Sequence, residues 1–252
     1  MTTQLAFLGQ FGDAIGFIFH QRKSVEGQTV GGTQFLHLLW THMKLSLAAM
    51  GLACAVAIPL GLWLGHIGKG GFLAINASNV GRAVPSLALI AFFIAYLGVG
   101  FSNVMVALAL LAIPPILTNA YVGVQQVERD TVDAARGMGM TGAEVVRRVE
   151  LPLALPLIFG GIRTSMVNVV ATATIAPLAG VVTLGDPIIN VSTYGDVGRL
   201  AASIVVAALA VFTELSLGTV QRALTPEGLK LASDRPSRRS WSPLTRKKEL
   251  IT

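Results

Sequence analysis

Three long windows of this sequence carry no charged side chain. Leu45–Gly65, Ala83–Val127 and Thr164–Gly185 contain no Asp, Glu, Lys or Arg. About 20 predominantly apolar residues suffice for a helix to cross a bilayer, so the middle window is long enough for two crossings. Because 53% of the residues are hydrophobic and only 13% are charged, an ordinary soluble domain is excluded. The sequence therefore predicts an all-α fold, that of a polytopic helical membrane protein.

The apolar stretches divide into about five predicted spans. They lie roughly at Leu39–Leu64, Ala83–Leu97, Val104–Val122, Leu155–Ile175 and Arg199–Leu217. Pro59 is tolerable in the first span because neighbouring helices can satisfy the carbonyl that it frees. Pro114-Pro115 is expected to kink the third span or to end its regular part.

The two ends of the chain are expected to lie outside the membrane domain, which takes residues 33–221. Leu5–His20 is too short to span and is interrupted by Asp13. We expect an interfacial helix there, with a re-entrant or cleaved segment as the alternative, and a polar linker over Gln21–Gly32. Residues 222–252 are rich in Pro, Ser and Arg and are predicted to form a disordered basic tail.

The positive charges cluster in two places. The net charge is +6, but eight of the nineteen basic residues lie from Arg222 onward and four more lie in Arg129–Arg148. This clustering argues against a nucleic-acid partner, because basic residues that flank spans report cytoplasmic placement. With five spans, the tail, the 123–150 loop and the turn at Lys69 fall on that side of the cell membrane. Arg22 and Lys23 fall on the other side.

The 133–152 stretch, DAARGMGMTGAEVVRRVELP, is strongly polar and lies between apolar segments. Two short helices broken near Gly139 fit it. Thr141 can cap the second helix with Glu144 completing a capping box, and Pro152 is expected to end that helix. On composition alone, an ordinary solvated loop explains the stretch equally well.

The spacing within this stretch resembles the cytoplasmic signature of ABC importer permeases. That signature reads Glu-Ala-Ala, three residues, Gly, nine residues, an aliphatic residue, one residue, then Leu-Pro. The matching positions are Asp133, Ala134, Ala135, Gly139, Val149, Leu151 and Pro152. Asp133 replaces the usual Glu and Val149 the usual Ile.

The rest of the chain, roughly Leu36 to Val220, resembles the short permeases of the glycine betaine, carnitine and choline branch. The likeness is clearest in GRAVPSLALIAF, RGMGMT, VELPLALPLIFGGIRT and ATATIAPLAG. It implies the type I ABC importer permease fold, with the 123–150 loop docked on a separate ATPase subunit. It also implies a second copy or a sister permease, and an extracytoplasmic solute-binding protein.

The expected solute is a small osmoprotectant such as glycine betaine, carnitine, choline or proline. The rival within the class is another small solute, methionine or an oxyanion. A stand-alone secondary transporter is a different class, and it would be expected to show inverted repeats or an ionisable cluster at midplane, neither of which the sequence has.

Two features inside the spans are candidates for the solute path. Arg163 is costly within a membrane and is expected to have a partner, for which Glu214 is the best candidate; snorkelling to the headgroups is the alternative. Thr164, Asn168 and Thr172 recur every four residues and so line one helix face. Such a stripe either lines a path or joins helices by hydrogen bonds, and joining is the commoner use.

The remaining residue types suggest no chemistry of the chain's own. The glycine-rich patches lack the Lys and Ser/Thr of a phosphate loop, so we expect no ATP binding, no cofactor and no enzyme activity. His20, His37, His42 and His66 lack metal-ligand spacing and are expected at the membrane interfaces. Quaternary ammonium recognition needs an aromatic cage, which the polar stripe lacks, so we expect it in the binding protein.

Overall fold

The computed structural model describes residues 2–24, 27–72, 76 and 84–225. Its elements follow the order α1 Thr2–Phe19, β1 Gln21–Lys23, β2 Thr29–Gly31, α2 Thr33–His66, α4 Ser86–Leu97, α5 Phe101–Gln125, α6 Arg129–Gly137, α7 Gly142–Val145, the π-helix η1 Val146–Glu150, α8 Leu151–Thr172, the 3₁₀-helix η2 Ala173–Ala179, α9 Asp186–Ile189 and α10 Val191–Leu224. The helical class is confirmed. One small difference is that the predicted polar linker forms an antiparallel hairpin, with Arg22 opposite Val30.

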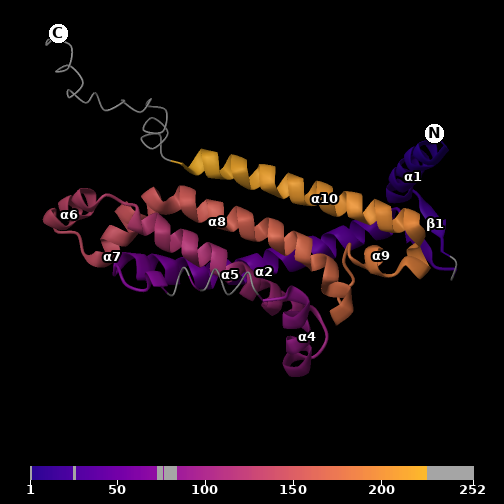
Figure 1. Cartoon of the computed structure of the whole chain (residues 1–252). Coiled ribbons are helices and arrows are strands. Elements are labelled where there is room, and N and C mark those ends of the chain that lie inside the picture. Colours follow the sequence, from indigo (N-terminus) through magenta and orange to yellow (C-terminus); the bar gives the residue numbers. More distant parts are fainter. Residues whose placement is uncertain (1, 25–26, 73–75, 77–83, 226–252) are drawn as a thin grey trace, which may run out of the picture.

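Four helical stretches in the described part of the chain are long and apolar enough to cross a membrane: Thr33–His66, Phe101–Gln125, Gly142–Ala179 and Val191–Leu224. They correspond to four of the five predicted spans. At the remaining one, α4 has only 12 residues, fewer than a crossing needs, and residues 77–83 lie outside the described part. α4 is directed away from the long helices, which run side by side (Figure 1).

Small residues let α2 and α5 approach closely. A Cβ at Gly61 would lie 2.6 Å from Ala120 Cβ, and one at Gly65 would lie 2.6 Å from Val124 Cβ. Because both contacts advance by four residues in the same sense, the two helices run in the same direction. His66 and Phe101 therefore lie at opposite ends of the bundle, and residues 67–100 connect those ends, as a five-crossing topology requires.

The later helices alternate in direction. A Cβ at Gly161 of α8 would lie 2.8 Å from Asn119 Cβ, while one at Gly123 would lie 3.0 Å from Ala154 Cβ, so α8 runs antiparallel to α5. On the other side of α8, Gln221 of α10 donates from Nε2 to the Pro156 carbonyl at 2.8 Å. α10 therefore ends beside the start of α8.

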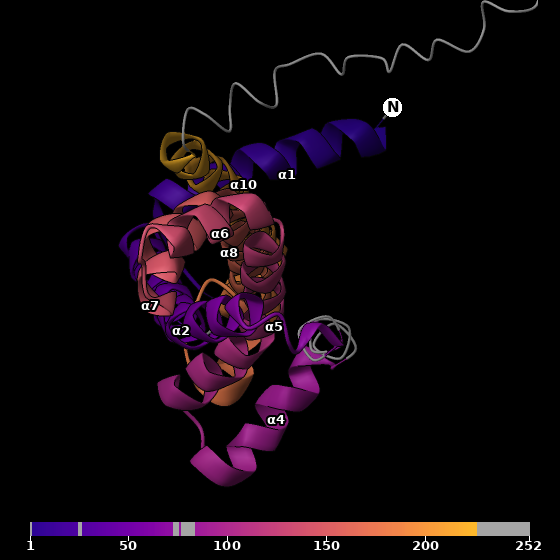
Figure 2. The ribbon, with the colours of Figure 1, turned by 90° about the vertical axis from the view of Figure 1, so that its left-hand side faces the viewer.

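The two ends of the bundle carry different segments (Figure 1). The 123–150 loop and the end of α10 lie at one end, where Lys69 follows α2. At the other end lie α1, the hairpin, α9 and the Gly98–Gly100 turn, whose Gly100 amide donates to the Ala179 carbonyl at 2.8 Å. Viewed along the bundle, α6 and α7 cover the first of these ends (Figure 2). The predicted disordered tail begins at Arg222, but Arg222–Leu224 belong to α10; its residues from 226 onward lie outside the described part.

α1 packs on the bundle at the end away from the 123–150 loop. Phe17 is buried and meets Phe35 of α2 edge to face, with ring centroids 5.8 Å apart. Ala14 is also buried, in one cluster with Ala201 and Ala202 of α10. The first described helix is therefore anchored by protein contacts on α2 and α10, in addition to any interfacial role.

The prolines leave the helices continuous. α5 contains both Pro114 and Pro115, so they do not end its regular part, and the alternative of a kink there stays a prediction. The expectation that Pro152 ends a helix is wrong, because α7, η1 and α8 follow one another without a break. The π-turn explains this: the Leu151 amide donates to the carbonyl of Val146, five residues back. The wider turn spares the ring of Pro152 a clash with the preceding turn.

Candidate functional site

The 123–150 loop folds as two short helices around Gly139. α6 ends at Gly137, and Gly139 has φ +87°, a value that favours glycine. The Gly139 amide donates to the Arg136 carbonyl at 2.9 Å and the Met140 amide to the Ala135 carbonyl at 3.2 Å. These two bonds form the usual glycine-dependent helix C-terminus. The predicted break at Gly139 is confirmed.

The predicted capping box at the start of α7 is also present. The Thr141 hydroxyl accepts from the Glu144 amide, and the Thr141 amide donates to Glu144 Oε2 at 2.9 Å. This backbone hydrogen bond and a second from the Thr141 hydroxyl hold the pKa of the Glu144 carboxyl below its usual range. Glu144 is therefore charged at neutral pH, and the cap fixes the path of the chain after Gly139.

The signature positions divide between the protein interior and the surface. Ala135 is buried, as is the nearby Val145, and α6 packs against α7 and η1. Asp133, Ala134, Gly139 and Thr141 are exposed, while Val149, Leu151 and Pro152 are half-buried. Met138 is 73% exposed beside Gly139. Met138 is not among the site residues predicted from the sequence. Its apolar side chain within a polar stretch could have indicated an exposed contact residue.

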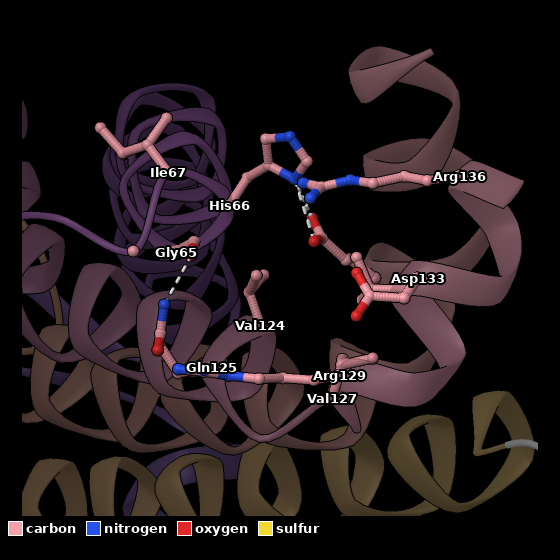
Figure 3. A pocket seen from close by; sticks show the side chains of 12 residues that line it. Gly65, His66, Ile67, Val124, Gln125, Val127, Arg129, Asp133 and Arg136 are labelled. Carbon is pink, nitrogen blue, oxygen red and sulfur yellow. Dashed lines mark hydrogen bonds and ion pairs between the residues drawn. The ribbon is translucent and has the colours of Figure 1, made fainter. Parts of the chain in front are cut away.

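A pocket of about 380 Å³ lies between the loop and the neighbouring ends of α2 and α5 (Figure 3). His66 and Glu150 meet there, with His66 Nδ1 2.9 Å from both carboxylate oxygens. Asp133 and Arg136 extend from α6 toward the same pocket (Figure 3). The sequence indicated no such pairing, because 84 residues separate His66 and Glu150.

His42 departs from the expected interfacial placement, whereas His66 at the end of α2 does not contradict it and has a partner within the chain. His66 is mostly enclosed by its contact with Glu150, its side chain being 17% exposed. His42 is fully buried, and its Nε2 lies 2.9 Å from the Val170 carbonyl of α8. A carbonyl near the end of α8 supplies this side chain with a polar partner, so burial is tolerated.

The predicted partner of Arg163 is in place. Arg163 Nε of α8 lies 3.0 Å from Glu214 Oε1 of α10. Arg163 Nη1 also donates to Gln221 Oε1 at 3.4 Å. The two charged side chains are 38% and 44% exposed within a single chain, so the pair lies at the edge of the bundle between two spans.

The polar stripe of α8 faces away from the other helices of the chain. Thr164 and Asn168 are exposed and Thr172 is half-buried. Thr164 donates to the Gly160 carbonyl of its own helix at 3.0 Å. Within the described residues, no hydrogen bond links the three side chains to another helix. The stripe is therefore available to solute or to another chain, and among the described residues it does not join helices.

The fold and these sites have counterparts among known proteins. Residues 57–227 match the family described as binding-protein-dependent transport system inner membrane component. The chain is 39% identical over 204 residues to the glycine betaine/carnitine/choline transport system permease protein of Bacillus subtilis, covering 81% of this chain and 94% of that protein. It is 40% identical over 204 residues to the choline transport system permease protein of the same organism, with the same coverage.

A structural comparison agrees at the level of fold. The MetNI methionine ABC transporter in an inward-facing conformation superposes with a TM-score of 0.66 and 19% sequence identity. The match covers 76% of this chain and 96% of that chain.

Proposed function

The chain belongs to the family of binding-protein-dependent transport system inner membrane components, and on that premise we propose that it is the permease subunit of an ABC importer. It forms the membrane-spanning pathway for a small osmoprotectant such as glycine betaine, carnitine, choline or proline. The two Bacillus subtilis relatives, named for glycine betaine, carnitine and choline, support this class of solute. The family and the apolar helices make it a multi-pass membrane protein.

The observation that carries the proposal is the loop built around Gly139. Its backbone is fixed by the glycine-dependent helix end and the capping box, and Ala135 and Val145 are buried in it. Asp133, Ala134 and Met138 are left exposed at one end of the bundle. A rigid surface of this kind suits docking on a separate ATPase subunit, which supplies the hydrolysis. The relatives are transport permeases and not enzymes.

The exposed polar stripe of α8 supports a pathway formed between two permease chains. Thr164 and Asn168 have no partner helix within the described chain, and exposed polar groups in a span call for a polar neighbour or a solute path. A second copy or a sister permease facing α8 would enclose the stripe. An extracytoplasmic binding protein delivers the solute at the opposite end from the loop, which we place in the cytoplasm.

Uptake by the complete system tests the solute class. The permease, its ATPase and its binding protein are expressed together, and uptake of labelled glycine betaine is measured with unlabelled choline, carnitine or proline as competitor. We expect competition by at least one of them. If none competes and methionine or an oxyanion is imported instead, the osmoprotectant assignment is wrong. A system that lacks only the permease is the control.

A further inference from the structure

His66 is the last residue of α2, and its ring is held on two sides by the segment that follows Gly139. Its Nδ1–H donates to the Glu150 carboxylate, at 2.9 Å from either oxygen. On the other side, a Cβ at Gly142 would lie only 3.2 Å from His66 Nε2. The ring therefore lies between the first residue of α7 and the last residue of η1.

Glu150 depends on this contact. Its side chain is 5% exposed, and within the described residues His66 is the hydrogen-bond partner of its carboxylate. A buried carboxylate without a partner is strongly disfavoured. Arg129, Asp133 and Arg136 line the same pocket, but no ion pair joins any of them to Glu150 in the described part of the chain. The His66 contact is therefore the polar link between α2 and the end of the loop, beside the apolar cluster of Leu62 against which Val146 packs.

α2 can carry a displacement of His66 through the membrane. It is one helix of 34 residues, and its outer end packs through Phe35 and Leu38 in the cluster that contains α1 and α10 residues. At the inner end, Gln125 Nε2 of α5 donates to the Gly65 carbonyl at 2.6 Å. The inner end of α2 is thus fixed both to α5 and to the loop.

We propose that His66 and Glu150 are positioning residues that transmit movement of the 123–150 loop to α2. This inference rests on the proposed function. The loop continues directly from η1 into α8, which is one route for coupling. The contact of His66 with Glu150 is a second route, because it joins the loop to α2. ATP-driven displacement of the loop then moves α2 and α8 together. Without the contact, the loop still docks on the ATPase but moves α8 alone.

Substitutions that keep or remove the donor at Nδ1 test the proposal. The variants are His66→Leu, Glu150→Gln and His66→Asn, whose amide nitrogen can replace Nδ1 as the donor. His37→Gln, at an exposed position near the outer end of the same helix, is the control. Solute uptake and ATP hydrolysis are measured on the complete complex in proteoliposomes.

We expect His66→Leu and Glu150→Gln to lower uptake about tenfold while ATP hydrolysis stays within about twofold, a typical size for coupling between two sites. His66→Asn restores most of the uptake, and His37→Gln changes neither rate. The double variant His66→Leu/Glu150→Gln matches the single variants, because both residues act through one contact. Unchanged uptake, an equal loss of hydrolysis, or multiplied losses in the double variant would each overturn the proposal.

A second measurement needs no solute. Arg136, Arg147 and Arg148 are exposed in the loop and are potential trypsin sites. In the full-length permease in lipid nanodiscs, His66→Leu and Glu150→Gln should speed cleavage there, whereas His66→Asn and His37→Gln should not. Equal cleavage rates in all variants contradict the contact itself. If the unaltered system imports none of the osmolytes, the proposed function fails, and this measurement still decides whether His66 holds the loop.

Discussion

Arg163 of α8 and Glu214 of α10 form an ion pair between two predicted spans, with 3.0 Å between Nε and Oε1. Gln221 of α10 makes two further hydrogen bonds to α8, because its Oε1 accepts from Arg163 and its Nε2 donates to the Pro156 carbonyl. The polar contacts between α8 and α10 therefore gather toward one end of the bundle, the end that carries the loop.

Removing one member of this pair should destabilise the permease more than removing both. We expect Arg163→Gln or Glu214→Gln to cost about 1–2 kcal/mol, since an unpaired charge in a span is costly but partial exposure reduces the effect. The double variant should recover most of that loss. Thermal unfolding of the purified protein in detergent measures it. Equal stability of all three variants would mean that each side chain is solvated independently.

The loop and the α9 end should lie on opposite sides of the membrane. We expect Thr141→Cys, in a Cys54→Ala background, to react with an impermeant maleimide only after cells are permeabilised. Ser192→Cys should react in intact cells. Both positions are exposed, so access to reagent decides the result. Labelling of Thr141→Cys from outside intact cells contradicts the cytoplasmic placement.

Gly139 should matter for coupling to the ATPase and not only for the turn. A Cβ there meets nothing within 4 Å in this chain, but φ is +87°. Asn tolerates positive φ better than Ala, whereas Ala is smaller. If close approach of the ATPase dominates, uptake should follow Gly, Ala, Asn and Leu in decreasing order, and Gly139→Leu should abolish uptake with normal membrane insertion. Higher uptake by Gly139→Asn than by Gly139→Ala would assign the effect to the backbone alone.

Gly61 should tolerate no side chain, because its Cβ would lie 2.9 Å from the Leu117 carbonyl as well as 2.6 Å from Ala120 Cβ. We expect Gly61→Ala to cost about 1–3 kcal/mol through overpacking. Gly51→Ala is the matched control in the same helix, since a Cβ at Gly51 meets nothing within 4 Å. Thermal unfolding of the two variants compares them. Equal stability would argue against the close α2–α5 contact.

Local features of the loop could be predicted from the sequence, whereas its attachment to the bundle could not. The break at Gly139 and the capping box of Thr141 and Glu144 each depend on residues within about one helical turn of each other. The spacing of those residues in the sequence therefore predicts both features. Arg163 and Glu214 could be paired across the chain because both charges lie at similar depth in spans and need neutralisation. Nothing in the sequence fixes the rotation of α2, on which the contact of His66 with Glu150 depends.

The expectations that failed share a physical cause. The missing amide of Pro152 predicts a helix end, but the π-turn that ends two residues before it accommodates the ring within a continuous helix. His42 was placed at an interface from its polarity, but the Val170 carbonyl offers it a buried partner. Each outcome depends on a backbone group supplied by another turn or another helix, which residue type does not report.

The π-turn over Val146–Glu150 also affects the direction in which the loop faces. An α-helix turns the chain by about 100° per residue, and a π-turn, which takes about one residue more per turn, turns it by less per residue. Replacing the π-turn by an α-turn of the same number of residues would therefore rotate α6 and α7, with the exposed Asp133 and Met138, relative to α8. Removing one residue together with that change would largely restore their direction. The direction of the docking surface thus depends on both the kind of turn and the number of residues in it.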